Sequence, residues 1–528
     1  MATTYRFNRM KKISQSQNAW LWVIFVLLAV NVLTTELYTS VWLDEVLFSM
    51  PAANQYFGLG FTSTAWPFQG KEAFWAGNVP LHTLLLCAWY KLFGFGIHQT
   101  RIFGYVLWSL ADCFLCLAAR RFGWVTTPKG LSLLAALAFL GNGVTFAFRS
   151  SRYEPLAVLL ATLCLLAFSI PSALWRNVAI LLVSTLFLPA CLALGPFYVV
   201  MAAVLLAVTR WKFLRELAMA GTGLAIGFGL LYLLYHHFGV WHDFTGALKK
   251  DEQAYHNPVV YIHVFTNWGT IPFRKGADFV RALASDNSSL ILALATGILF
   301  AFRGKDPPLW HPRLFTFSFI AFLAVPIGLL LFYAFPIYYW WMRYLPLCLA
   351  FAALVESRRV PAGGRAFKIF VACTILIVSL SGLPGRLLLA SLDLRERDYS
   401  RVENFVRGAV KPGDVVVADY QAFYPLEKLK VRTYYRLYLH HMTPEEATSV
   451  NCLIIDPQIF NGTRQKLGGT WRNTGQEDLN DQHFGVKILD RLMPHYFLQQ
   501  SNHKYNLAVY RKIPSPSTTQ TNQPSATP

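Results

Sequence analysis

Apolar residues follow one another along this chain in long runs, and short basic segments separate the runs. As a helix, a run of about 17 to 25 apolar residues crosses about 30 Å of hydrocarbon. The pattern therefore predicts a polytopic α-helical membrane protein with about eleven spans. We place these spans at about 20–38, 101–119, 130–148, 155–170, 177–193, 196–209, 216–236, 289–302, 314–335, 343–356 and 367–385.

The basic residues indicate the orientation of these spans. Lys and Arg cluster at the N-terminus in RFNRMKK and in alternate loops such as RRFGWVTTPK and ESRRVPAGGRAFK. Cytoplasmic loops carry such an excess of positive charge. We therefore predict a multi-pass protein of the inner (plasma) membrane with a cytoplasmic N-terminus. Eleven spans then put the C-terminal segment on the periplasmic or extracellular face.

The apolar segment at 80–94 has a different prediction, because it is only about fifteen residues long. A run of this length is more typical of an interfacial helix than of a span. Counting it as a span would also move the basic RRFGWVTTPK loop to the outer face. We therefore expect it to lie flat on the outer surface, inside a long outer loop at 39–100.

Beyond residue 390 the chain turns polar and its periodicity changes. The stretch YSRVENFVRGAV has apolar residues at helical spacing, and FGVKILDRLM (484–493) predicts a second helix. KPGDVVVADY, NCLIIDP and HKYNLAVYRK predict strands. We therefore divide the chain into a transmembrane domain at 1–390, a small soluble α/β domain at 391–512 on the outer face, and a disordered tail at 513–528.

Composition agrees with this division and limits the partners. The chain is 55% hydrophobic and 14% charged, whereas a soluble domain has about 25% charged residues. The net charge of +19 would suit nucleic acid, but the basic residues lie in loops between the spans. We therefore expect membrane lipids, and no nucleic acid, among the partners. The close pair Cys113 and Cys116 does not by itself make a metal site.

Ionisable residues gather where the predicted spans meet the outer face. They are Asp44, Glu45, Arg101, Arg149, Arg152, Glu154 and Arg343, the last followed by Tyr344. Charges at membrane depth are costly, so they serve a pathway, a partner or a ligand. Arginine suits a phosphate, because its planar fork donates two hydrogen bonds at once. A carboxylate suits a hydroxyl, because it accepts the proton as the hydroxyl attacks.

These residues have structural interpretations too, which the sequence leaves open. An arginine at the end of a span can reach out to lipid phosphates. The pair Asp44 and Glu45 can cap a surface helix. Asp112, within the second span, can pair with a neighbouring helix. The histidines of the loops have no spacing typical of metal ligands.

The order of these features resembles the GT-C superfamily of glycosyltransferases, specifically the branch of protein O-mannosyltransferases and the lipid A aminoarabinose transferase. The resemblance rests on five stretches in family order: WLDE, GNVPLHTLLLCAWYKLFG, HQTRIFGYVLWSLADCFLCLAARRFG, FAFRSSRYEPLAVLLATLCLLAF and YYWWMRYLPLCLAFAALVE. They cover roughly residues 20 to 170, with a weaker match around 340 to 355. A GT-C-like fold is thus expected.

The resemblance implies an inverting glycosyltransferase. Such an enzyme moves a sugar from a polyprenyl-phosphate donor to a hydroxyl of a lipid, glycan or protein acceptor on the outer face. The family's catalytic base maps onto Asp44, with Glu45 as its helper. The family's substrate-binding positions map onto Arg101, Arg152, Glu154, Arg343 and Tyr344, and Arg149 joins them by its charge and position.

The sequence departs from the family pattern at three places: Asn78-Val79-Pro80, Glu154 and Leu194. These departures concern the sugar and the acceptor more than the reaction class. The resemblance requires no cofactor and assigns no metal ligands. A divalent metal stays an open alternative, for which Asp44 and Glu154 are the candidate oxygen ligands.

Two other function classes stay open. A transporter or flippase for lipid-linked sugars would place polar groups at mid-membrane on interrupted helices. Here only Asp112 lies clearly inside a predicted span. A non-catalytic envelope assembly protein would not require acids and arginines to converge on one face.

Overall fold

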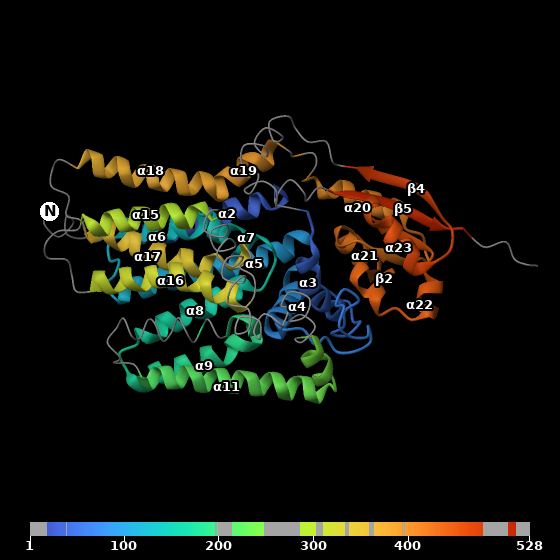
Figure 1. The fold of residues 1–528 in the computed structure, drawn as a ribbon, viewed down its shortest axis with the longest axis horizontal. Coiled ribbons are helices and arrows are strands. Elements are labelled where there is room, and N and C mark those ends of the chain that lie inside the picture. Colours follow the sequence, from blue (N-terminus) through green and yellow to red (C-terminus); the bar gives the residue numbers. More distant parts are fainter. Residues whose placement is uncertain are drawn as a thin grey trace, which may run out of the picture.

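A long bundle of helices and a small sheet domain beyond one end of it make up the fold (Figure 1). The computed structural model describes residues 18–37, 40–195, 198, 214–247, 286–302, 310–332, 337–357, 364–392, 394, 397–478 and 505–513. Three predictions fall outside these residues: most of the span at 196–209, the helix at 484–493 and nearly all of the tail at 513–528.

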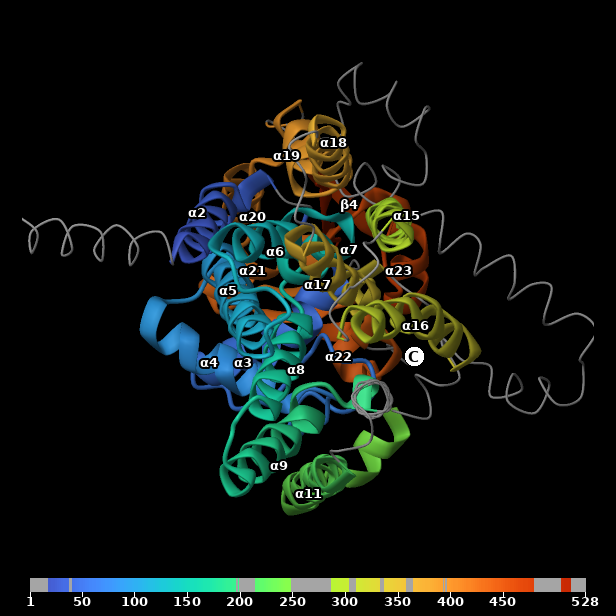
Figure 2. The same ribbon diagram turned by 90° about the vertical axis from the view of Figure 1, so that its left-hand side faces the viewer.

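The bundle helices coincide with the predicted spans to within a few residues. They are α2 (Ala19–Leu33), α5 (Ile97–Arg121), α6 (Pro128–Leu140), α7 (Asn142–Arg149), α8 (Glu154–Phe168), α9 (Ala173–Ala190), α11 (Leu214–His237), α15 (Asn287–Ala301), α16 (Trp310–Phe332), α17 (Trp341–Ser357), α18 (Arg365–Ser381) and α19 (Leu383–Leu392). Seen end-on, α17 lies near the middle, and α9 and α11 lie together at the edge (Figure 2).

Length and apolar composition qualify three of the described helices as membrane spans: α5, α9 and α11. A fourth is reached if α6 and α7, which are bent by 64° at a short break, count as one span. The chain therefore has the helices of a membrane protein, while the number eleven stays a prediction.

The single span predicted at 130–148 is wrong in its shape, because it is two helices that meet at Gly141. Tyr344 of α17 fills the inside of this bend, where its hydroxyl donates to the carbonyl of Leu137 at 2.9 Å. A Cβ at Gly141 would lie 2.1 Å from that hydroxyl oxygen. Only glycine lets the aromatic ring approach the backbone so closely.

Four of the predicted inner loops make contacts in two pairs at the end of the bundle away from the sheet domain. Glu356, at the end of α17, accepts backbone N–H groups of Thr126 and Thr127 at 2.8–3.1 Å and so caps the start of α6. Arg176 of α9 pairs with Glu216 of α11 at 2.7 Å. The loops that the charge pattern groups together are thus neighbours in space.

Two helices from the segment at 39–100 lie between the bundle and the sheet domain (Figure 1). They are α3 (Leu43–Tyr56) and α4 (Pro80–Phe93). α4 buries Leu86 and Tyr90 and exposes Leu84, Leu92 and Phe93. An apolar exposed face on a short helix is what the predicted interfacial position requires.

The sheet domain has five strands in the order β2-β1-β3-β5-β4. They are β1 (Val415–Ala418), β2 (Arg432–Tyr435), β3 (Cys452–Ile455), β4 (Trp471–Asp478) and β5 (Asn506–Lys512), with helices α20 (Tyr399–Ala409), α21 (Phe423–Leu429), α22 (Pro444–Ser449) and α23 (Phe460–Leu467). β2, β1 and β3 are parallel, and β5 runs antiparallel to β3 and β4. The predicted helix at 399–410 and the three predicted strands are present, and β2 and β4 add to them.

Direct hydrogen bonds fix the sheet domain to the segment at 39–100. Thr64 donates its hydroxyl to the carbonyl of Thr433 at 2.8 Å, and its own carbonyl accepts the N–H of Tyr435 at 3.3 Å. Lys71 pairs with Glu446 at 2.5 Å. The free edge of β2 is therefore occupied by a segment that precedes it by more than 300 residues.

Labelling of single cysteines tests the predicted orientation, in a Cys373→Ser background because Cys373 is the exposed native thiol. We expect Thr474→Cys, exposed in β4, to react with a membrane-impermeant maleimide in intact spheroplasts. Ser172→Cys, exposed before α9, should react only after permeabilisation. The opposite labelling would place the sheet domain and Asp44 on the cytoplasmic side.

Candidate active site

The first turn of α3 carries both acids of the WLDE stretch. The helix begins after Trp42, whose backbone is extended, and Asp44 and Glu45 are its second and third residues. Successive side chains on a helix point about 100° apart, because 3.6 residues make one turn. The two carboxylates therefore meet different partners.

Asp44 forms an ion pair with Arg152, and Arg152 also holds Glu154. The Arg152 Nε lies 2.9 Å and 3.1 Å from the two carboxylate oxygens of Glu154, and an Nη nitrogen pairs with Asp44. Side-chain exposure is 0% for Glu154, 4% for Arg152 and 20% for Asp44. Asp44 is thus the member of this triad that a substrate can reach.

Aromatic rings surround the guanidinium of Arg152. Its Cζ lies 3.6 Å from the ring centre of Tyr338 and 5.5 Å from that of Phe48. The turn that delivers Arg152 contains Ser151 with a φ of +54°, a left-handed conformation that is strained for a residue with a side chain. The contacts to the two acids use three of the five N–H groups that an arginine donates. Two N–H groups remain for an anionic ligand.

Glu45 belongs to a second, fully buried cluster. Arg101 of α5 donates Nε and Nη2 to its two oxygens at 3.1 Å and 3.0 Å, a bidentate pair with 1% and 0% of the side chains exposed. Tyr424 of α21 donates its hydroxyl to the same carboxylate at 2.9 Å. Burial, and then the charge of Glu45, raise the pKa of Tyr424 well above its usual value, so its hydroxyl stays protonated. Glu45 thereby joins α3 to α5 and to the sheet domain.

The other two arginines also have partners within the protein. Arg149 donates to the side chain of Asn31 at 2.7 Å and to the carbonyl of Thr34 at 2.6 Å, and so ties α7 to the end of α2. Arg343 pairs with Asp286 at 2.7 Å, and Asp286 caps α15. The assignment of Arg101, Arg149, Arg343 and Tyr344 to substrate stays a prediction.

The sequence left two structural roles open: helix capping for Asp44 and Glu45, and pairing with a neighbouring helix for Asp112. Asp44 and Glu45 do stand in a first helical turn, where negative charge is favourable. Their hydrogen bonds, however, go to arginines and to Tyr424. Asp112 accepts a weak S–H contact from Cys116 of its own helix at 3.8 Å. Its other oxygen has no hydrogen-bond partner among the described residues.

Sequence reasoning missed Asp286, Asn31 and Tyr424. Asp286 had a local signal, since Asp before Asn-Ser-Ser and an apolar run is typical of a helix N-cap. Tyr424 had none, because it lies 379 residues from the carboxylate that it binds.

A divalent metal fits this donor set poorly. Asp44 and Glu154, the two candidate ligands, already share the guanidinium of Arg152, which stands between them as a cation. Among the described residues, no group of three or more His, Cys, Asp or Glu side chains could hold a metal ion. We therefore derive no step through a metal.

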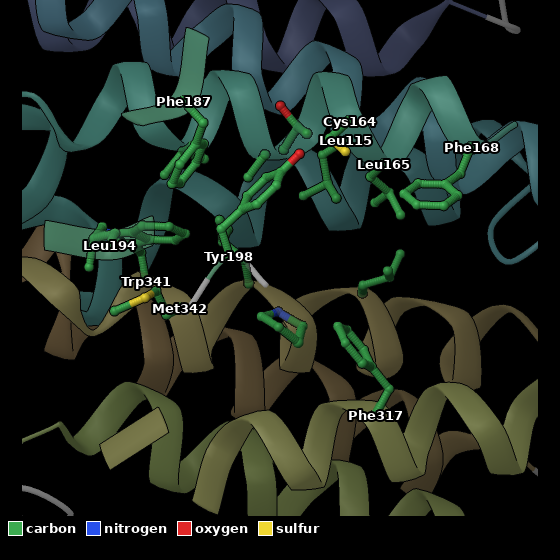
Figure 3. Close-up of a pocket in the computed structure, with 16 residues that line it drawn as sticks. Leu115, Cys164, Leu165, Phe168, Phe187, Leu194, Tyr198, Phe317, Trp341 and Met342 are labelled. Atoms are coloured by element: carbon green, nitrogen blue, oxygen red, sulfur yellow. The ribbon is translucent and has the colours of Figure 1, made fainter. Parts of the chain in front are cut away.

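An apolar cavity of about 170 Å³ lies between α5, α8, α9, α16 and α17. On α8 its lining begins at Val158, one helical turn after Glu154. Figure 3 shows Leu194, Trp341 and Met342 at one end, Phe168 and Phe317 at the other, and Tyr198 between them. On α8 the lining residues Val158, Ala161, Thr162, Leu165 and Phe168 follow one face of the helix, and Cys164 beside them also lines the cavity. Glu154 is one turn before Val158 on the same face.

The Glu45–Arg101 pair should respond to substitution as a unit. Arg101→Met leaves the carboxylate buried without its cation, which costs about 3–5 kcal/mol of stability. Adding Glu45→Met should recover most of this loss, because an apolar pair of similar volume replaces the ion pair. Thermal unfolding in detergent measures both. A double variant no more stable than Arg101→Met would contradict the pairing.

The fold can now be compared with known proteins. No protein-family profile and no curated protein matches the sequence. Among solved structures, the fold resembles ArnT from Cupriavidus metallidurans bound to undecaprenyl phosphate, with a TM-score of 0.57 and 12% identity over 93% of this chain and 98% of that chain. Two lower scores are to AftD, an arabinofuranosyltransferase from Mycobacteria (0.46; 13% identity; 93% and 40% covered), and to an Archaeoglobus fulgidus oligosaccharyltransferase with Zn and sulfate (0.44; 11% identity; 84% and 69% covered). ArnT is a member of the GT-C superfamily, and this chain has the GT-C fold that the sequence resemblance predicts.

Proposed function

We propose that this protein is an inverting glycosyltransferase that moves a sugar from a polyprenyl-phosphate donor to an acceptor hydroxyl, at the membrane face that carries the sheet domain. The observation that carries the proposal is the continuity of charge and apolar surface along one face of α8. An arginine with N–H groups to spare lies at its start, and an apolar cavity follows. A lipid phosphate would match both features, because its anionic head group suits the arginine and its hydrocarbon chain suits the apolar cavity.

The dimensions agree with a prenyl chain. The lining residues of α8 extend from Val158 to Phe168, which is about 15 Å at 1.5 Å per residue. The cavity lining is almost entirely carbon, so it favours a hydrocarbon ligand. Glu154 lies about 6 Å from Val158 toward the start of the same helix, and its carboxylate pairs with Arg152. The donor phosphate would then lie beside Arg152, with the first isoprene units in the cavity.

Asp44 is placed to act as the general base. Its carboxylate is partly exposed, whereas Glu45 and Glu154 are fully buried. In the proposed step, Asp44 takes the proton of the acceptor hydroxyl, whose oxygen forms a bond to the anomeric carbon. The bond from that carbon to the phosphate oxygen breaks, and its electron pair stays on the phosphate. Arg152 stabilises this developing charge, as preorganised donors do in a dry site.

The comparison with ArnT adds support from a second direction. That structure holds undecaprenyl phosphate, a lipid of the class proposed here. At 12% identity the likeness extends to the fold, so the donor remains a proposal for this chain. Sugar, prenyl length and acceptor stay open, because a likeness of fold does not extend to them.

A flippase for lipid-linked sugars is the second candidate, and the bend between α6 and α7 favours it. Interrupted helices line the substrate paths of many transporters. Here, however, Tyr344 fills the bend. A flippase would move the labelled donor across a vesicle membrane without consuming it.

Asp44→Asn tests the base directly. The amide keeps the size of the side chain and a hydrogen-bond acceptor for Arg152, but it does not take a proton. We expect turnover to fall about a hundred- to ten-thousand-fold, while donor affinity stays close to that of the wild type. The assay is consumption of labelled polyprenyl-phosphate sugars by purified protein in nanodiscs. Glu72→Gln, an exposed acid of the same segment, is the matched control. An Asp44→Asn variant with wild-type turnover would remove Asp44 from the chemistry.

Ala161→Phe tests the cavity. Filling a packed site costs about 1–3 kcal/mol, which is roughly five- to 150-fold in affinity. We expect KM to rise by this factor for a polyprenyl donor and to stay constant for a donor analogue whose prenyl chain is replaced by a methyl group. Leu182→Phe, on the exposed face of α9, is the control. Equal effects of Ala161→Phe on both donors would show that the prenyl chain lies elsewhere.

A further inference from the structure

Tyr424 reaches from the sheet domain into the ion pair beside the candidate base. It is the second residue of α21, and both its side chain and that of Glu45 are fully buried. The hydrogen bond between them measures 2.9 Å. Phe95 and Tyr399 pack against its ring, with ring centres 5.5 Å and 6.0 Å away. The hydroxyl is therefore held in one place by packing on two sides.

The first turn of α3 depends on such tertiary contacts. Its N-cap residue, Trp42, makes no side-chain hydrogen bond to the turn. A helix start without a cap leaves backbone N–H groups without local partners, so it frays more readily. Glu45 compensates for the missing cap, since its carboxylate accepts three hydrogen bonds from two other elements and so holds the first turn in place. Asp44 is the preceding residue of the same turn.

We infer that the sheet domain is a working part of the transfer site, in which Tyr424 is a positioning residue that holds Asp44 against Arg152 through Glu45. The inference rests on the proposed function and deepens it. It explains why a soluble domain at the far end of the chain contributes a buried side chain to the segment that carries the base. Docking of the sheet domain then also sets the position of the Asp44 carboxylate.

The inference can be tested without releasing the domain. Thr64 and Lys71 fix the sheet domain to the same segment through β2 and Glu446, independently of Tyr424. Tyr424→Phe removes one hydroxyl and keeps the ring. Tyr435→Phe is the matched control, because Tyr435 donates to a buried carboxylate, Glu427, at 3.1 Å within the sheet domain.

The first measurement is turnover with the polyprenyl donor. Loss of a hydrogen bond to a buried charge is typically worth a factor of about ten to a hundred. We expect kcat of Tyr424→Phe to fall by this factor at an unchanged donor KM, and Tyr435→Phe to retain wild-type kcat. In a Glu45→Gln background, Tyr424→Phe should have a much smaller effect, because the two residues act through one bond. Equal effects in both backgrounds would overturn the inference.

The second measurement does not depend on the reaction. Amide hydrogen exchange of residues 43–48 should be faster in Tyr424→Phe than in the wild type or in Tyr435→Phe. Unchanged exchange and unchanged kcat in Tyr424→Phe would refute the positioning role. A wild-type protein that consumes no polyprenyl-phosphate sugar would refute the proposed function instead. The exchange experiment would then still decide whether Tyr424 orders the turn.

Discussion

An ionised side chain that leaves water loses several kcal/mol of solvation, and only a partner charge or a set of hydrogen bonds offsets the loss. Among the described residues, five arginines are more than nine-tenths buried at one end of the helical bundle: Arg101, Arg149, Arg152, Arg343 and Arg386. Each of these arginines binds an acceptor on an element other than its own. The need to satisfy these guanidinium groups determines how the segments of that end are held together.

The consequence is a rigid frame around one accessible carboxylate. Arg101 anchors α3 to α5, Arg149 anchors α7 to α2, and Arg343 anchors α17 to the start of α15. Arg152 differs, because one of its two acids faces an opening and two of its N–H groups have no protein acceptor among the described residues. Preorganised charge of this kind suits a reaction in which a phosphate gains negative charge as it leaves.

The apolar half of the site follows from the periodicity of one helix. On α8 the residues at three- and four-residue spacing after Glu154 are small or apolar, and they line the cavity (Figure 3). The same helix therefore presents a charge at its beginning and a hydrocarbon surface along its length. This arrangement holds an amphipathic lipid in one orientation, so its head group meets Arg152 and Asp44 rather than the opposite end of the bundle.

The sequence by itself determined the features that depend on neighbouring residues. Apolar runs located most of the described bundle helices and the buried strands β1 and β3, alternation located β5, and basic loops grouped segments at one end, since hydrophobicity and periodicity are local properties. Sequence also selected Asp44, Arg152 and Glu154 as candidates.

The sequence could not show which acid pairs with which arginine. Asp44 and Glu45 are adjacent in the chain, yet a helix turns their side chains toward different arginines. The bend at Gly141 required Tyr344 from a distant helix, and the position of Tyr424 required the docking of a whole domain. Only the tertiary structure decided these points, because each is a contact between elements whose separation in sequence leaves no local pattern.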